Sequence, residues 1–484
     1  MTNLARLADA ALERFGDHPS LWFEGSWYTS GALHDTAARI AGGLWELGVR
    51  PGERVVVVMA NGPEVSMVYQ AVWRAGAVVT PVVFLVTAQE LQHILADSGA
   101  VAVVTSPELV PKFGALGVRT LVVGTAGFDE LRAAEPLPIV DVGADALAAL
   151  LYTGGTTGRS KGVPLTHANL SAAGASSRAV SYTPGLNLGL TALPMSHSYG
   201  MLLTVGALHA KEAPVTVLQR WFDPAAWLAL AAQHRVQVAA VVPSMLVMLL
   251  AHDPAKHDLS TLQRVYSGAA PLPRAVAEAF ERAVPSARVL EGYGCTETGG
   301  ILTATPPDVP RPGTVGRAVP GVELRLAEDG EIVVRGANVM SGYWRGEPVA
   351  GGWFATGDIG RLDEDGYLTI VDRKKDIIIR GGFNVYPRDV EDVLAQHPAV
   401  AMAAVVGRPD ERLGEEVVAF VVLREPCEPA DLEAFAGERL APTKRPRDIR
   451  IVEEIPLTSV GKLNRKALRA SLRPRPCPDA GVNA

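Results

Sequence analysis

A segment rich in glycine, threonine and cations is the first candidate for chemistry. "YTGGTTGRSKG", from Tyr152 to Gly162, ends the apolar run "ALAALLY" and contains Arg159 and Lys161. Glycine packs poorly and costs backbone entropy, so a dense run marks either a surface turn or a loop whose N–H groups surround phosphate oxygens. Lys161 would add a point charge to a phosphate loop. The segment is not a Walker loop, because it has no Gly-Lys-Ser/Thr triplet. Its residues alone leave both interpretations open.

Further motifs along the chain favour the phosphate loop. Together with the first segment they resemble, in order, those of the acyl-adenylate-forming superfamily: acyl-CoA synthetases, aryl-CoA ligases, adenylation domains and firefly-type luciferases. These motifs are "YGCTETGG" (293–300), "GEIVVRGANVMSGYW" (330–344), "GWFATGDIGRLDEDGYLTIVDRKKDIII" (352–379), "GGFNVYPRDVED" (381–392) and "LTSVGKLNRKAL" (457–468). The resemblance extends from about Asp17 to Leu472 and is greatest to a stand-alone acyl-CoA synthetase.

The resemblance implies an acid–thiol ligase that uses ATP, Mg²⁺ and CoA. A carboxylate attacks the α-phosphate of ATP and expels pyrophosphate, and the acyl group then passes to the CoA thiol. Because two anions approach each other in the first step, that step depends on positive charge and oriented donors more than on an acid or a base. A carrier-protein thiol in place of CoA, a substrate other than a carboxylic acid, and a non-catalytic nucleotide-binding protein stay open as alternatives. The last is disfavoured because every charged residue of the implied site is present. An oxidoreductase is disfavoured because no strand–GxGxxG–helix unit occurs.

Most of the nucleotide site follows from the resemblance. The residues implied for the β- and γ-phosphates are Thr153, Gly155, Thr156, Thr157, Gly158 and Lys161. Thr296 would contact the α-phosphate, and Glu297 would hold Mg²⁺, a hard cation that favours carboxylate oxygen. Gly268, Ala269 and Ala270 would line the adenine and acyl sites, and Gly294 and Tyr293 would lie at adenine, with the Tyr293 ring stacked on the base.

Three further residues complete the implied adenylation machinery. Asp358 would accept hydrogen bonds from the ribose hydroxyls with Arg373 assisting, and Lys462 would bridge the carboxylate and the α-phosphate. Read in isolation, Asp358 would be an Asx turn, Lys462 solvated surface, and the Thr296-Glu297 pair a helix cap. The phosphate loop departs from the family at two positions. Gly154 stands in place of a serine and Ser160 in place of a proline.

The second half-reaction needs the lysine to leave so that a thiol can approach. The resemblance implies that the small domain rotates about Lys375, two residues after Arg373, because a hinge absorbs large changes in φ and ψ at a few residues. Gly381 and Gly382 would line the thiol tunnel. The candidate contacts for the CoA phosphates, for which a solvated surface position is an equal alternative, are Arg380, Lys444 and Arg445.

The acyl pocket is the least specific part of the resemblance. Its candidate residues are His197, Tyr199, Met201, Val242, Gly292 and Gly299, with Trp221 as a possible gate. The walls carry no charge that would bind an ammonium or a second carboxylate. The sequence therefore favours an apolar aliphatic or aromatic acid, although His197 alone would fit a structural role as well.

The elements that position these residues alternate between strand and helix. "RVVVVMA" (54–60) is typical of a buried strand, and the apolar residues from Val65 to Trp73 recur with the spacing of one helix face. Thr87 and Glu90 form a capping-box pattern. We expect an α/β fold: residues 1–371 form a large ATP- and acyl-binding domain of parallel βαβ-type sheets with a small β-barrel-like part, 372–376 a hinge, 377–470 a mobile α+β catalytic lid, and 471–484 a disordered tail.

Composition restricts the partners and the compartment. The chain has 484 residues, of which 48% are hydrophobic and 20% charged, as in an ordinary globular protein of about three domains. Its net charge of −7 provides no attraction to nucleic acid or to anionic membranes. Three dispersed cysteines and the absence of a signal segment or a long apolar run indicate a cytoplasmic protein without a membrane span. We expect a monomer or a homodimer that binds a carboxylic acid, ATP and CoA, with a carrier protein as a possible partner.

Overall fold

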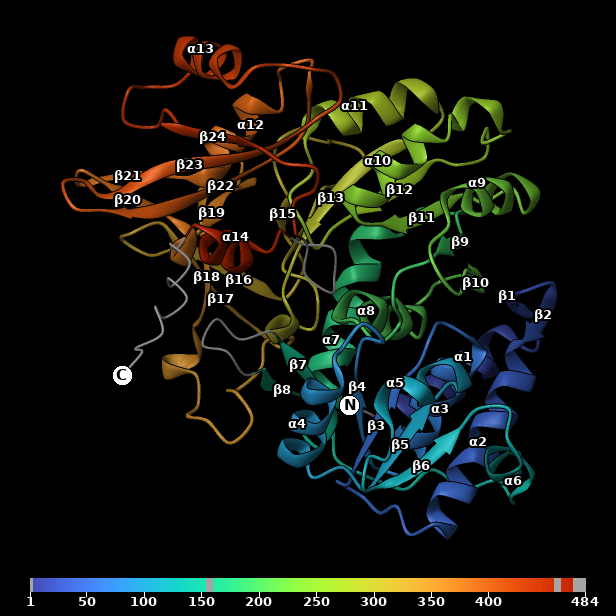
Figure 1. Ribbon diagram of the computed structural model, residues 1–484. Helices are drawn as coiled ribbons and strands as arrows, with labels where there is room; N and C mark the ends of the chain where they lie inside the picture. Colours follow the sequence, from blue (N-terminus) through green and yellow to red (C-terminus); the bar gives the residue numbers. More distant parts are fainter. Residues whose placement is uncertain (1–2, 154–159, 457–462, 473–484) are drawn as a thin grey trace, which may run out of the picture. The chain divides into compact units, whose positions relative to one another are not determined.

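The computed structural model describes residues 3–153, 160–456 and 463–472 (Figure 1). The chain forms two compact units. The first contains Met1–Arg325, Val333–Thr356 and Leu362–Thr369, and the second contains Leu326–Ile332, Gly357–Arg361 and Ile370–Ala484. The predicted α/β class is confirmed, because mixed and parallel sheets alternate with helices through most of the chain.

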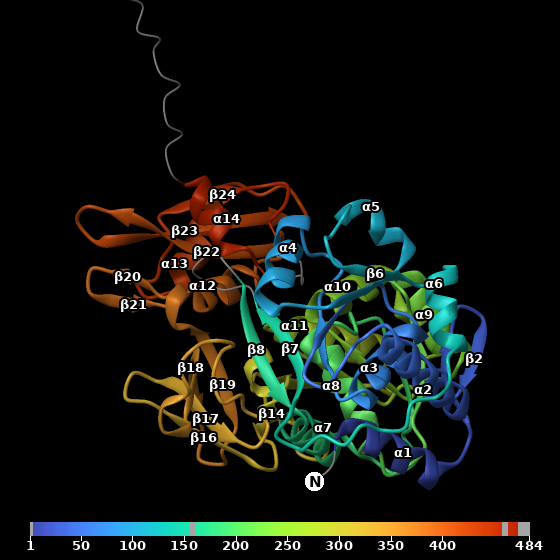
Figure 2. The same ribbon diagram turned by 90° about the horizontal axis from the view of Figure 1, so that it is seen from below.

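A six-stranded sheet lies in the first unit. Its order is β6 (Arg119–Val122), β5 (Ala102–Thr105), β3 (Arg54–Val58), β4 (Val78–Pro81), β7 (Leu147–Thr153) and β8 (Lys161–Thr166). All neighbouring strands are parallel except β7 and β8, which pair antiparallel and lie side by side in Figure 2. The central strand β3 is buried over Val55–Val58, as expected for a parallel sheet covered on both faces.

The helices of this region confirm the expected periodicity. The helices are α1 (Leu4–Phe15), α2 (Ser30–Glu46), α3 (Pro63–Arg74), α4 (Ala88–Ser98), α5 (Val110–Phe113) and α6 (Ala126–Ala133). The predicted stripe of α3 is buried, from Val65 to Trp73. The capping box of α4 is present, because Thr87 Oγ1 accepts a hydrogen bond from Glu90 N at 3.2 Å and Glu90 Oε2 accepts one from Thr87 N at 3.0 Å.

A nine-stranded sheet forms the other half of the first unit. Its order is β15 (Arg317–Ala318), β14 (Thr303–Ala304), β13 (Arg288–Tyr293), β12 (Arg264–Ser267), β11 (Val238–Val241), β9 (Leu188–Thr191), β10 (Val215–Leu218), β1 (Pro19–Phe23) and β2 (Ser26–Thr29). The strands from β13 to β1 in this order are parallel. The associated helices are α7 (His167–Ser181), α8 (Ser198–Ala207), α9 (Pro224–Gln233), α10 (Pro243–Ala251) and α11 (Arg274–Ala283). Strand β11 ends at Val241, since Pro243 occupies the first turn of α10.

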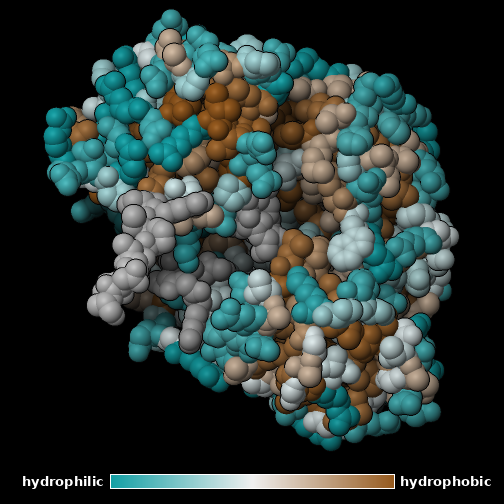
Figure 3. All heavy atoms as spheres, viewed as in Figure 1, coloured by the Kyte–Doolittle hydropathy of each residue, from teal (hydrophilic) through white to brown (hydrophobic). Residues whose placement is uncertain are grey.

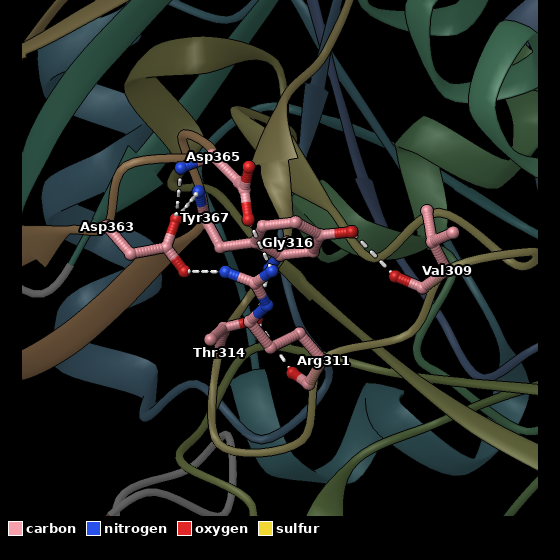
Figure 4. Close-up of polar contacts among 7 residues, drawn as sticks. All are labelled: Val309, Arg311, Thr314, Gly316, Asp363, Asp365 and Tyr367. Carbon is pink, nitrogen blue, oxygen red and sulfur yellow. Dashed lines mark hydrogen bonds and ion pairs between the residues drawn. The ribbon is translucent and has the colours of Figure 1, made fainter.

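Four strands between residues 322 and 373 form a separate sheet. A four-stranded sheet has the order β16 (Val322–Leu326), β17 (Glu331–Gly336), β18 (Phe354–Leu362) and β19 (Leu368–Arg373). The turn between β18 and β19 is held by Arg311, whose guanidinium pairs with Asp363 and Asp365, the latter at 2.6 Å (Figure 4). Tyr367 Oη donates to Val309 O at 2.6 Å and completes this clasp.

The second unit contains a five-stranded sheet. Its strands are β21 (Phe383–Val385), β20 (Ile378–Arg380), β23 (Gly414–Leu423) and β22 (Val400–Asp410), and β24 (Asp448–Ile451) pairs with β23. Its helices are α12 (Pro387–Leu394), α13 (Pro429–Arg439) and α14 (Arg465–Ser471), and Lys374–Asp376 forms a single 3₁₀ turn. The α+β composition expected for this part of the chain is present. The domain limits at 371 and 377 stay a prediction, and residue 471 ends α14, while 473–484 lie outside the described residues.

On the face drawn in Figure 3, hydrophobic areas are interspersed with hydrophilic ones. Within the described ranges, no helix is both long enough and apolar enough to cross a bilayer.

Candidate active site

Several candidate residues follow the carboxyl ends of neighbouring parallel strands. Strands β9, β11, β12 and β13 are adjacent in the nine-stranded sheet. The residues that follow or end them are His197, Val242, Gly268, Ala269, Ala270, Gly292 and Tyr293. Since the carboxyl ends of parallel strands meet at one edge, where ligands of open α/β sheets bind, the fold brings together residues that the sequence places up to about a hundred positions apart.

Tyr199 packs against Gly268 at this edge, beside Gly292, and we call these three residues the Tyr199 wall. A β-carbon on Gly268 would lie 3.4 Å from Tyr199 Cε1 and 3.3 Å from Gly292 O. Tyr199 Oη donates to Tyr266 O at 3.1 Å, which fixes the ring. Burial raises the pKa of Tyr199, so its phenol is neutral. The Tyr199 wall therefore carries no charge, and the Tyr199 ring lies close to the backbone of Gly268.

The loop after β12 holds a strained residue. Ala269 has φ of 68°, in the left-handed region, where a residue with a β-carbon costs roughly 1–2 kcal/mol. At the end of β13, Gly294 has no room for a side chain, because a β-carbon there would lie 2.5 Å from Gly300 O. Both backbone turns thus belong to the segments predicted to surround adenine.

Glu297 is held by a tyrosine to which we assigned no role from the sequence. Tyr343 Oη donates to Glu297 Oε1 at 2.9 Å, and Met340 N donates to Glu297 O at 2.8 Å. The buried Asn338 amide donates to Thr298 O at 2.9 Å and Ile301 O at 2.8 Å. The segment that carries Tyr343 is therefore fixed to the turn that carries Glu297. An aromatic residue in the motif 330–344 was the available signal.

Lys161 approaches the same tyrosine from the other sheet. Thr153 and Lys161 are register partners of β7 and β8, and Lys161 Nζ lies 5.2 Å from the centre of the Tyr343 ring, within cation–π range. Trp344 N donates to Gly162 O at 2.8 Å and secures this approach. Lys161, Tyr343 and Glu297 thus form one contiguous group. Gly154, Gly155, Thr156, Thr157, Gly158 and Lys462 lie outside the described residues.

Asp358 and Arg373 meet within the second unit. Arg373 Nε donates to Asp358 Oδ1 at 2.8 Å, and the side chains are 51% and 8% exposed respectively. Glu331 supports this pair, because its Oε1 accepts from Gly357 N at 2.9 Å and its Oε2 contacts Lys374 Nζ at 2.7 Å. The hydrogen bonds that Lys374 donates to Asp329 and Glu331 raise its pKa. The structure confirms that the two residues lie together, and their ribose role stays a prediction.

The residues expected for the thiol step have varied surroundings. Burial, and then the charge of Arg373, lower the pKa of Lys375. Gly381 and Gly382 form the turn between β20 and β21 with φ of 58° and 82°. Arg380 is not the exposed cation that a CoA contact requires, because it is buried and paired with Glu416 at 2.7 Å. The remaining two candidates, Lys444 and Arg445, contact Asp389 (2.5 Å) and Leu440 O (3.0 Å).

The other acyl-pocket candidates do not all face the Tyr199 wall. His197 Nδ1 accepts from Tyr199 N at 3.2 Å and caps α8, in which Met201 is buried. A β-carbon on Gly299 would lie 2.8 Å from the Ala173 side chain of α7, so this glycine marks a helix contact. Trp221 is 39% exposed, and its ring stands edge-on to Phe84.

The donor set fits Mg²⁺ that is shared with phosphate oxygens. Across the part of the chain that the structure describes, no group of three or more His, Cys, Asp or Glu side chains is arranged to hold a metal. Glu297 offers one carboxylate, of which Tyr343 engages a single oxygen. A single protein carboxylate is typical of Mg²⁺ that takes its other ligands from substrate phosphates and water.

Family profiles agree with this fold and site. The AMP-binding enzyme family matches residues 8–344, and the AMP-binding enzyme C-terminal domain matches residues 389–462. The chain therefore belongs to the AMP-binding enzyme family, and the resemblance seen in its motifs is confirmed.

Relatives within the family narrow the class. The feruloyl-CoA synthase of Amycolatopsis sp is 37% identical over 475 residues, covering 92% of this chain and 94% of that protein. The long-chain-fatty-acid–CoA ligase of Bacillus subtilis (strain 168) is 34% identical over 526 residues, covering 96% and 93%. The solved structure of ATP-bound MatB from Rhodopseudomonas palustris superposes with a TM-score of 0.89 at 31% identity, covering 97% of this chain and 99% of that one. The chain is an AMP-forming acid–CoA ligase that uses ATP, Mg²⁺ and CoA.

Proposed function

We propose that this enzyme joins an apolar carboxylic acid, aliphatic or aromatic, to CoA through an acyl-adenylate. The observation that carries the choice of acid is the uncharged wall of Tyr199, Gly268 and Gly292. An amino acid or a dicarboxylic acid would need a counter-charge in its pocket, because burying an unpaired charge is costly. The names of the relatives, a feruloyl-CoA synthase and a long-chain-fatty-acid–CoA ligase, fit both apolar classes.

In the proposed adenylation step, this chain's residues reduce the repulsion between two anions. Lys161 and Thr153, together with Gly155, Thr156, Thr157 and Gly158, hold the β- and γ-phosphates. Thr296 donates to the α-phosphate, and Glu297 holds Mg²⁺, which supplies charge neutralisation as a Lewis acid when bound. Asp358 accepts hydrogen bonds from the ribose, the Tyr293 ring stacks on adenine, and Lys462 bridges the acid and the α-phosphate.

The proposed second step brings the CoA thiol to the acyl-adenylate. Rotation about Lys375 would withdraw Lys462, and the glycine turn of Gly381 and Gly382 would line the path of the thiol. We propose a cytoplasmic enzyme, and we propose no partner beyond its three substrates.

Pyrophosphate release tests this function directly. The enzyme is incubated with Mg·ATP and a panel of aliphatic, aromatic, amino and dicarboxylic acids, with and without CoA, with Lys462→Ala as the control. CoA-dependent turnover on an apolar acid supports the proposal. A single burst that is indifferent to CoA indicates a carrier-protein thiol as the acceptor, and absence of release with every acid refutes it.

A second variant tests the acyl wall itself. Gly268→Ala places a methyl group 3.4 Å from the Tyr199 ring and so narrows the site beside it. We expect kcat/KM to fall most for the bulkiest acid of the panel, because one methylene in a hydrophobic pocket is worth roughly 1–3 kcal/mol of discrimination. The KM for ATP should stay within about twofold of the wild-type value. An equal loss for all acids would remove these residues from the acyl pocket.

A further inference from the structure

The helix that follows Lys462 in sequence is anchored at its first turn. Asn464 N donates to Pro456 O at 2.8 Å, and the Asn464 side chain accepts from Ala467 N at 3.1 Å and caps α14. Leu463 and Leu468 pack in one apolar cluster with Ile455. The two residues that flank positions 457–462 nearest in the described chain, Pro456 and Leu463, thus belong to a fixed framework.

An ion pair buried within the second unit secures the start of this helix. Arg465 Nη2 lies 2.8 Å from Glu391 Oε1 and 2.8 Å from Oε2, and the side chains are 15% and 13% exposed. Glu391 Oε1 also accepts from Val405 N at 2.7 Å. Glu391 therefore ties α14 to α12 and β22 at a position three residues from Lys462.

The same framework continues to the ribose pair. Asp372 Oδ2 accepts from Arg388 N at 2.9 Å at the start of α12, and Asp372 Oδ1 accepts from Arg373 N at 2.7 Å. Arg388 Nη1 donates to Ile370 O at 2.9 Å. A series of short polar contacts thus links Arg373, through α12 and Glu391, to Arg465.

Buried charge makes this pair sensitive to the ionisation of Glu391. Burial raises the pKa of Glu391 to about 7, and the charge of Arg465 and the hydrogen bond from Val405 N oppose that rise. The other groups that face it are Asp372 and Asp392, whose charges raise the pKa further. A pair that is desolvated to this extent contributes more to defining one arrangement than to net stability.

We propose that Glu391 and Arg465 are positioning residues for adenylation: their ion pair fixes the first turn of α14, which begins three residues after Lys462 in the sequence. The inference rests on the proposed function, in which Lys462 acts in the first half-reaction and is withdrawn in the second. It follows that losing the pair slows adenylation much more than thioester formation. A simple stabilising role would impair both half-reactions equally.

Glu391→Gln tests the proposal with little change of shape. We expect kcat for acid-dependent ATP–pyrophosphate exchange to fall by about 20- to 100-fold, the loss typical of a misplaced catalytic group. The KM for ATP should stay within about twofold of the wild-type value, and thioester formation from synthetic acyl-AMP and CoA within about threefold. The Arg465→Lys variant should keep a larger part of the exchange rate than Glu391→Gln does, because it keeps the charge and loses only the bidentate geometry.

Asp448→Asn is the matched control. Asp448 pairs with Arg408 at 2.9 Å in the same unit, and the same substitution of amide for carboxylate there should leave both half-reactions unchanged. The pH profile adds a second readout. The wild-type exchange rate should decline as Glu391 is protonated below about pH 7, and this decline should be absent in Glu391→Gln.

Hydrogen exchange separates failure of this inference from failure of the proposed function. The amides of 465–471 should exchange at least about tenfold faster in Glu391→Gln than in the wild type or in Asp448→Asn, whatever reaction the enzyme catalyses. Unchanged exchange, or equal loss of both half-reactions, would overturn the inference. A wild-type enzyme that releases no pyrophosphate with any acid would refute the proposed function, and the exchange measurement would still decide whether the pair fixes α14.

Discussion

Two candidate carboxylates, one in each unit, are held in contrasting ways. Glu297, in the first unit, is half-buried, and its side chain accepts a hydrogen bond from a neutral phenol, Tyr343. Within the described residues no lysine or arginine pairs with it. Asp358, in the second unit, is 6% exposed and pairs with Arg373, beside the contacts that Glu331 makes.

The contrast separates two uses of a negative charge. A carboxylate that keeps its charge and a free oxygen is suited to bind a hard cation. A carboxylate that is paired with a cation and held in one orientation is suited to accept hydrogen bonds in a fixed direction. The Glu297 side chain therefore accepts a hydrogen bond from a neutral group, whereas Asp358 pairs with a cation beside Glu331, and the two should respond differently to mutation.

Loss of the uncompensated charge should have the largest effect. In Glu297→Gln we expect the adenylation kcat to fall by roughly 10²- to 10³-fold, because metal charge stabilisation is worth several kcal/mol. The Mg²⁺ concentration needed for half-maximal rate should rise. Pyrophosphate exchange measured across a Mg²⁺ titration gives both values, and an unchanged Mg²⁺ midpoint would contradict a metal role for Glu297.

Loss of the neutralised charge should mainly weaken nucleotide binding. In Asp358→Asn we expect the KM for ATP to rise roughly 10- to 100-fold, the equivalent of about 1.5–3 kcal/mol for a charged hydrogen bond. The Mg²⁺ midpoint should not move. Steady-state kinetics with ATP and with 2′,3′-dideoxy-ATP check the cause, since the variant and the wild type should differ little with the analogue.

Removal of the hydrogen bond that Tyr343 donates to the Glu297 side chain should have a measurable effect. Tyr343→Phe deletes the hydrogen bond of 2.9 Å, which is worth about 0.5–1.5 kcal/mol, and should reduce the adenylation rate by about 3- to 10-fold. Tyr182→Phe is the matched control, because Tyr182 Oη donates to Glu212 Oε1 at 3.0 Å elsewhere in the first unit. Equal rates in the two variants would show that Glu297 is oriented by other means.

Removal of one support of Asp358 should have the smallest effect. Glu331→Gln keeps an acceptor for Gly357 N and loses the charge that faces Lys374, which is half exposed. Exposed pairs of this kind contribute about 0–1 kcal/mol, so the KM for ATP should change by less than about threefold. A change as large as that of Asp358→Asn would show that the position of Asp358 depends mainly on Glu331.

Local structure was predictable from the sequence where nearby residues decide it. The buried stripe of α3 and the capping box of α4 depend on spacings of three and four residues and are present as expected. The secondary structure at Pro243 was harder to predict, because its apolar neighbours are typical of a continuing strand, whereas its ring favours the first turn of a helix, here α10. The antiparallel pairing of β7 with β8 was also not foreseen.

Contacts between distant residues limited the prediction of the site. The motifs gave the residue types, and the structure brings Asp358 to Arg373 and Tyr199 to Gly268. The link from Tyr343 to Glu297 spans 46 positions, and no periodicity within either motif indicates it. The buried state of Arg380 depends on Glu416 of another strand, so its charge alone suggested a surface contact.

The fixation of Trp344 has a consequence for biosynthesis. Its backbone and indole N–H groups donate to Gly162 O and to Asp97 O, at 2.8 Å and 3.2 Å, so three distant segments meet at one residue. Because a chain grows from its N-terminus at about 5–20 residues per second, the earlier two segments wait on the ribosome for roughly ten seconds or more before the tryptophan is made. During that interval the strand that carries Lys161 and Gly162 lacks the contact that Trp344 later makes with it.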